Sequence, residues 1–158
     1  MPVSKTATAV LALLLLLAAC TPTRVELLAS FTSGDVEYEL VTQTNHQGPD
    51  APCVGVSNDL DTGAGIISMA CPTVEAEETQ YAASLEAQGS VFVVGYGLEP
   101  GEQIEFDDAV RVITTGQVDG RRFFLIQLTE SPGTEPFEIS VRAPDGTTRS
   151  IVSHGVED

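Results

Sequence analysis

The chain has 158 residues, of which 42% are hydrophobic and 19% are charged, and its formal net charge at pH 7 is −16. This length fits one domain, and the apolar content exceeds that of disordered chains. Nucleic-acid binding depends on clustered cations. The chain has 7 basic residues against 23 acidic ones, so no nucleic acid is expected as a partner.

The segment 1–19 has the pattern of a signal peptide. Lys5 gives it a cationic start, and an apolar run broken only by Thr8 extends from Ala7 to Ala19. This run is shorter than the roughly 20 residues that a membrane-spanning helix needs. A cationic start before a short apolar stretch is typical of secretion signals, so residues 1–19 are predicted to be removed.

The apolar run ends in Leu17-Ala18-Ala19-Cys20, which resembles the lipobox of bacterial lipoprotein precursors. The resemblance implies that cleavage before Cys20 leaves an N-terminus whose sulfur carries a diacylglyceryl group. Each buried methylene contributes about 0.8 kcal/mol, and two acyl chains suffice for stable anchoring. Residues 20–24 are then a lipidated N-terminus and a short tether at the extracytoplasmic face of the cell membrane. Ordinary cleavage that leaves a free thiol is the alternative.

Residues 25–158 are predicted to form a single β domain. Short apolar segments alternate with turns rich in Gly, Pro, Asn and Asp, which is typical of an antiparallel sandwich or barrel of about 8–10 short strands. Val91–Val94 and Phe123–Ile126 are continuously apolar and predict central strands covered on both faces. The predicted strands are 25–30, 36–42, 53–57, 66–71, 90–96, 103–106, 110–115, 122–128, 137–142 and 148–153.

Cys53 and Cys71 are predicted to form a disulfide. They remain as an even pair once Cys20 is set aside, and exported domains are oxidised. The segments 53–58 and 66–71 have matched lengths around a turn-rich centre. Pairing them as a hairpin places residue i opposite residue 124 − i, so the two cysteines face each other across the strands. Two free thiols, or a metal site of cysteine and histidine, are the alternatives.

Residues 72–89 fit the strand pattern less well than the rest of the domain. They are rich in helix formers, with acidic side chains in the first turns and Gly89 suited to a C-terminal stop. One prediction is a short helix within 74–88. The other is an irregular loop that leads into a strand around Tyr81–Leu85.

The sequence contains no recognisable catalytic motif, so no catalytic residue and no cofactor is predicted. His46 lies in a polar turn and His154 near the end of the chain, where surface histidines without a catalytic role are common. With two histidines and no neighbouring free cysteine, a structural zinc site is not expected.

Four aspartates are the candidate metal ligands. Asp59 and Asp61 occupy alternate positions, as at the opening of an EF-hand loop, but Ala70 stands where the bidentate glutamate of such a loop belongs. Asp107 and Asp108 form the other candidate, between two predicted strands. Solvated turns, in which aspartate caps the local backbone, are the competing interpretation of both.

The C-terminal part, from Gly95-Tyr96-Gly97 through Arg122-Phe123-Phe124 to Ala143-Pro144-Asp145-Gly146, resembles small secreted β modules of bacterial envelope lipoproteins without an assigned function. The resemblance implies an architecture and no chemistry. The expected function is a lipid-anchored, non-enzymatic module that binds an envelope protein or wall component, or stabilises the envelope. A secreted hydrolase that uses carboxylates as acid and base, and a calcium-binding acidic domain, are the two alternatives.

Overall fold

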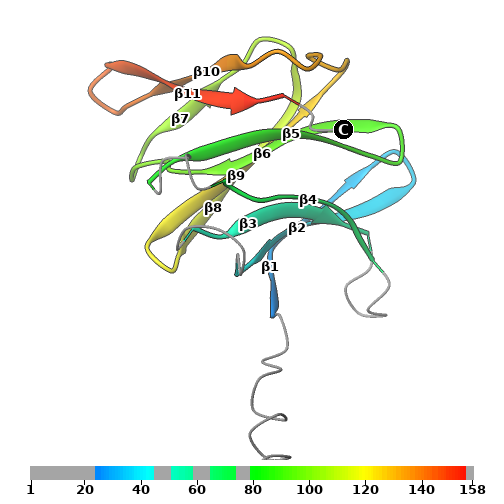
Figure 1. Cartoon of the computed structure of the whole chain (residues 1–158). Helices are drawn as coiled ribbons and strands as arrows, with labels where there is room; N and C mark the ends of the chain where they lie inside the picture. The colour runs from blue at the N-terminus through cyan, green and yellow to red at the C-terminus, as the bar shows by residue number, and fades with distance from the viewer. Residues whose placement is uncertain (1–23, 45–50, 59–64, 74–78, 156–158) are drawn as a thin grey trace, which may run out of the picture.

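A computed structural model describes residues 24–44, 51–58, 65–73 and 79–155, which form two β-sheets packed face to face (Figure 1). The all-β prediction is confirmed, because none of these residues lies in a helix. It follows that this part of the chain offers no helix able to cross a membrane.

The smaller sheet is a four-stranded meander in the order β1-β2-β3-β4. All of its neighbouring strands are antiparallel. Its strands are β1 (Val25–Ser33), β2 (Val36–Gln43), β3 (Cys53–Ser57) and β4 (Ile66–Ala70).

The larger sheet has seven strands in the order β7-β10-β11-β5-β6-β9-β8. Its strands are β5 (Tyr81–Ala87), β6 (Ser90–Tyr96), β7 (Gln103–Glu105), β8 (Ala109–Val118), β9 (Arg121–Leu128), β10 (Phe137–Arg142) and β11 (Thr148–His154). The edge strands β7 and β8 follow each other in the chain, so the sheet curls and is nearly closed. Among the described strands, only β11 and β5 run parallel, and their described pairing covers two positions.

The strands β6 and β9 are covered on both faces, as their apolar runs predict. On one face, Phe92, Val94 and Leu125 belong to a core shared with the smaller sheet. On the other face, Val93 and Ile126 pack in a second core with residues of β10 and β11. The domain therefore has two hydrophobic cores separated by the middle of the larger sheet.

The edge strands β1 and β8 are joined along one side of the sandwich. Arg111 of β8 donates a hydrogen bond from Nη1 to the carbonyl oxygen of Thr32 at 2.6 Å, and its guanidinium lies over the ring of Phe31. Gln127 of β9 donates from Nε2 to Ser33 Oγ. These contacts close this side of the sandwich.

Residues 81–87 form the strand β5, so the helix predicted within 74–88 is wrong for residues 79–88 and the alternative strand is correct. Tyr81, Ala83 and Leu85 point into the first core with a period of two. Burial between β11 and β6 outweighs the helix preference of these residues, as tertiary packing often does. Residues 74–78 lie outside the described part. With β5 included, the described chain has one strand more than the upper limit predicted.

Cys53 and Cys71 form the predicted disulfide, with a sequence separation of 18. The predicted hairpin register holds over the adjacent pairs, after which a bulge shifts it by one residue. These pairs are Val54–Ala70, Gly55–Met69 and Val56–Ser68. The sequence symmetry of the two segments therefore predicted both the register of the hairpin and the disulfide.

Replacing both cysteines with alanine should lower the free energy of unfolding by about 3 kcal/mol, because the unfolded chain regains the freedom that the closed loop removes. Urea denaturation of the double variant and the wild type measures the difference. The circular dichroism of the folded variant should keep its β signal, since both cores remain intact. An unchanged unfolding midpoint would contradict a stabilising role for this disulfide.

Candidate functional site

A hollow of about 470 Å³ lies between the two sheets on the side of β4 and β5. We call it the β4–β5 groove. Its walls are formed by the end of β4 with Cys71 and by the segment Ala83–Glu86 of β5. His154, the last residue of β11, and Gly155 complete them. The volume lies within the roughly 300–1,000 Å³ that is typical of ligand sites.

The groove exists because β11 accompanies β5 over only part of its length. β11 pairs with Ala82 and Ala83, whereas the pairing described for Ser84–Ala87 is with β6 alone, and β4 packs near β5 without pairing with it. Gly155 packs tightly against the backbone of Thr134, so a Cβ at this position would clash there. This contact holds the end of β11 against the β9–β10 connection.

Ser84 is a polar residue buried in the wall of the groove. Ser84 is 5% exposed, and its Oγ has no hydrogen-bond partner among the described residues. A buried hydroxyl in this state costs about 1–3 kcal/mol, and nearly all such groups in folded proteins are satisfied. Ser57, also buried in a strand, instead donates to the carbonyl oxygen of Gly65 at 2.6 Å. The fold therefore leaves one inaccessible hydroxyl next to the groove without a hydrogen bond.

Tyr81 and His154 form one end of the groove. Their rings stack with centroids 5.7 Å apart and planes inclined by 27°. A serine nucleophile needs a hydrogen bond to its general base, and Ser84 makes no such bond to His154. Among the described residues, Ser84 and His154 are therefore not joined by the hydrogen bond of a serine–histidine dyad.

The predicted metal ligands do not come together where the structure describes them. Asp107 and Asp108 are exposed at the corner between β7 and β8. In the described ranges, no cluster of three or more His, Cys, Asp or Glu side chains could hold a metal ion. Four residues singled out from the sequence lie outside these ranges, namely Cys20, His46, Asp59 and Asp61.

A second polar feature is the ion pair between Arg149 of β11 and Glu102. The guanidinium donates to both carboxylate oxygens, at 2.8 Å from Nε to Oε1 and 2.6 Å from Nη2 to Oε2. Glu102 is 7% exposed. The hydrogen bond from Arg149 is the main reason that the pKa of Glu102 lies below its ordinary value, and the same bond raises the pKa of Arg149.

Arg149 also bonds to two groups outside the ion pair. Arg149 donates to the carbonyl oxygen of Gly97, which follows β6, and to Oε1 of Gln80, which precedes β5. One guanidinium thus joins β11 to the start of β5 and to the β6–β7 connection.

Neither Ser84 nor Glu102 was identified from the sequence. Ser84 lies in a segment that also suits a helix, and a single serine among small residues gives no signal of burial. Glu102 lies in the turn Glu99-Pro100-Gly101-Glu102, and its partner is 47 residues away in sequence. No short-range pattern could connect these two residues.

Comparisons with protein-family models, with curated proteins and with solved structures found no match for this chain. What the domain can bind is therefore inferred from its own residues and their geometry.

Replacing Arg149 with methionine should lower the free energy of unfolding by about 3 kcal/mol, because Glu102 would stay buried without a partner. The matched control is Arg142→Met, which removes an ion pair with Glu105 whose side chains are 55% and 41% exposed. An exposed pair contributes about 0–1 kcal/mol, so the control should change little. Urea denaturation at pH 7 measures both, and equal losses would contradict the role of Arg149.

The pH dependence tests the same pair. Because the pKa of Glu102 is lowered on folding, its stabilisation is complete above the ordinary glutamate pKa and is lost as the pH falls through the lowered value. The difference in unfolding free energy between the wild type and Glu102→Gln should therefore shrink on acidification. A difference that stays constant down to about pH 3 would contradict this linkage.

Proposed function

We propose that this chain is a bacterial lipoprotein, held at the extracytoplasmic face of the cell membrane, whose β domain binds a partner without catalysing a reaction. The observation that carries the proposal is the short distance in sequence between the lipobox and the folded domain. Cys20 lies just before Arg24, and β1 begins at Val25. The chain from Cys20 to Arg24 spans at most about 14 Å, so a lipid on Cys20 would keep the domain near the headgroups.

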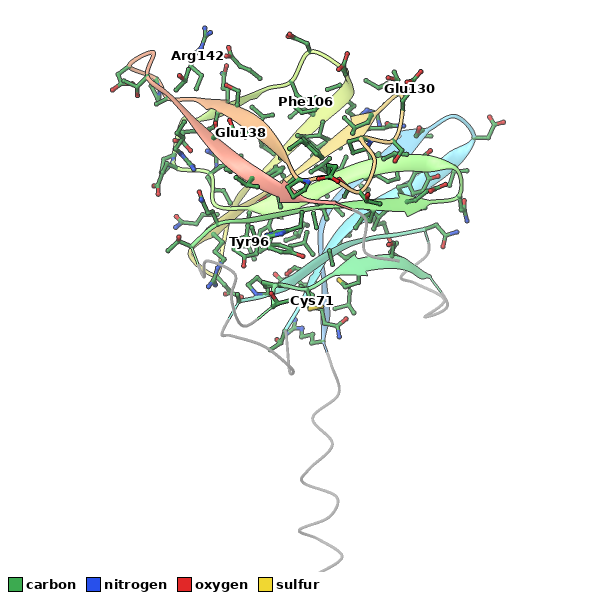
Figure 2. The ribbon with its side chains drawn as sticks, turned by 45° about the horizontal axis from the view of Figure 1, so that its top comes forward. Cys71, Tyr96, Phe106, Glu130, Glu138 and Arg142 are labelled. Atoms are coloured by element: carbon green, nitrogen blue, oxygen red, sulfur yellow. A yellow bond between two sulfur atoms is a disulfide. The ribbon has the colours of Figure 1, made fainter. Side chains whose placement is uncertain are left out.

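The arrangement of the domain is compatible with such an anchor. The start of β1 and the β10–β11 hairpin lie at opposite ends of the domain (Figure 1). In Figure 2 the hairpin residues Glu138 and Arg142 lie far from Cys71, which belongs to the side of the smaller sheet. An anchored domain would turn its β1 end to the membrane and its hairpin away from it.

The charge of the chain indicates what kind of attachment and partner to expect. A net charge of −16 would be repelled by an anionic leaflet, so lipid and not electrostatic attraction would hold the domain at the membrane. The same charge favours partners that are neutral or basic at the surface that meets this domain.

The geometry supports binding over hydrolysis. A carboxylate hydrolase needs a general acid whose pKa is raised, usually opposite a second carboxylate. Glu102, the most deeply buried carboxylate described, has a lowered pKa and is held by Arg149. It therefore acts as a fixed anion, which suits a structural role.

The proposal predicts that the mature wild-type protein, expressed in a bacterial host, carries a diacylglyceryl group on Cys20 and is recovered with membranes. Mass spectrometry of the N-terminal peptide and cell fractionation measure these two properties. Cys20→Ser should carry no lipid, because the acceptor sulfur is gone. The double variant Cys53→Ala/Cys71→Ala is the matched control and should keep the lipid. A wild-type peptide without fatty acid, or intact precursor in the cytosol, would refute the proposal.

A further inference from the structure

We infer that Asp119, in the turn between β8 and β9, is a site of covalent modification, where the backbone isomerises to isoaspartate through a cyclic succinimide. Asp145, the only other aspartate that a glycine follows, is protected from the same reaction by hydrogen bonds. The inference goes beyond the function proposed above and does not depend on it. It rests on the contrast between two turns that share a reactive dipeptide and differ in what holds it.

The reaction involves only the aspartate, the glycine that follows it and water. The glycine nitrogen attacks Cγ of the protonated carboxyl group, and the hydroxyl of that group leaves with the amide proton as water. The C–N bond that forms closes a five-membered succinimide ring. Water then opens the ring at one of its two carbonyl groups, and opening at the backbone carbonyl leaves the main chain running through Cβ. Glycine permits the attack because it has no side chain to crowd the nitrogen.

The β8–β9 turn requires the reactive dipeptide for its own geometry. Val118 pairs with Arg121, so Asp119 and Gly120 form a two-residue loop. The φ angles of the two loop residues are 46° and 77°. Such loops, with positive φ at both positions, favour Asp-Gly because aspartate tolerates this conformation and glycine adopts it readily. The reactive dipeptide is therefore a structural requirement of this hairpin.

At Asp119, neither of the two reacting groups is engaged. Both dipeptides are fully exposed, so solvent access does not distinguish the two turns. Among the described residues, the Asp119 carboxylate makes no hydrogen bond or ion pair, and the Gly120 nitrogen donates to no acceptor. Neither group must therefore be released from a partner before the two can react.

At Asp145, in the β10–β11 hairpin, both reacting groups are engaged. Thr147 donates to Oδ1 of Asp145 from its Oγ1 at 2.6 Å and from its backbone nitrogen at 2.9 Å. The bond from Oγ1, followed by the one from the backbone, lowers the pKa of Asp145 and so disfavours the protonated carboxyl that reacts. The nucleophile is also held, because the Gly146 nitrogen donates to the carbonyl oxygen of Ala143 at 2.9 Å. Ring closure here requires that all three bonds break.

The modification changes the end of the domain where β1 begins. Isoaspartate makes the main chain of a two-residue loop one carbon longer, which weakens the pairing of Val118 with Arg121 that closes the loop. These two residues and Asp119 line a hollow of about 360 Å³ together with Arg24 and Glu26. The product therefore alters the walls of this hollow and leaves the β10–β11 hairpin as it was.

The test uses the purified full chain, incubated in neutral buffer made with ¹⁸O-labelled water and then digested with trypsin in ordinary water. Cleavage after arginine gives the peptides 112–121 and 143–149, each with one Asp-Gly. Mass spectrometry and chromatography measure the label and the isoaspartate isomer in each peptide. Both should accumulate about tenfold faster in 112–121, because three hydrogen bonds hold the groups that react in 143–149. In urea the two peptides should react at similar rates, because the fold no longer supplies these bonds.

Two pairs of variants test the residues. Thr147→Val should raise the rate at Asp145 about fivefold, because the bond from Oγ1 is lost. Thr148→Val, an exposed change in the same hairpin without a bond to Asp145, should leave that rate within about twofold. Asp119→Glu should prevent modification of its turn, because glutamate would have to close a six-membered ring. Asp145→Glu is its control and should leave the rate at Asp119 unchanged.

The inference is overturned if the folded chain modifies 143–149 as fast as 112–121, or if the difference between the peptides persists in urea. It is also overturned if 112–121 stays unlabelled in the folded chain over a period that labels it in urea. An unchanged rate at Asp145 in Thr147→Val would refute the protective role of the hydrogen bonds. The anchoring proposal is tested separately, since Cys20→Ser without lipid should give the same labelling of both peptides.

Discussion

The burial of β6 and β9 on both faces is the constraint on which the rest of this fold depends. Strands that are apolar throughout must be covered twice, and the smaller sheet covers only one of their faces. The remaining strands of the same sheet therefore curl over the other face and form the second core. In the described part of this curled sheet, β11 pairs with β5 at Ala82 and Ala83. The groove between β4 and β5 lies beside the point where this described pairing ends.

The ion pair of Arg149 and Glu102 stabilises the place where the sheet curls. Both partners come from segments distant in sequence, and the guanidinium also bonds to groups next to β5 and β6. The chain has a large excess of acidic residues, and in this pair an arginine holds one of their carboxylates in a fixed, buried position. In the smaller sheet, the disulfide bonds Cys71 to β3 beside the groove and so stabilises this sheet. The disulfide therefore stabilises the smaller sheet, and the ion pair stabilises the larger one.

Local patterns sufficed for much of the fold and for little of the site. The two apolar runs and the symmetry around Cys53 and Cys71 each reflect contacts within a strand or a hairpin, and these predictions are confirmed. β5 was ambiguous because its small residues suit a helix in isolation, and burial between two strands decides otherwise. The groove depends on where β11 stops beside β5, which is a non-local property. No short pattern records it, and Ser84 alone gives no sign of it.

Hydrogen exchange followed by mass spectrometry tests most directly whether two-sided burial organises this domain. We expect the slowest exchange in Phe92–Val94 of β6 and Phe124–Ile126 of β9, because opening them requires exposure of both cores. The segment Ser84–Ala87 should exchange faster than these two, since in the described chain it pairs with β6 alone, whereas β6 and β9 each pair with a strand on both sides. Exchange in β6 and β9 as fast as in the edge strands β1 and β8 would contradict the central role given to them.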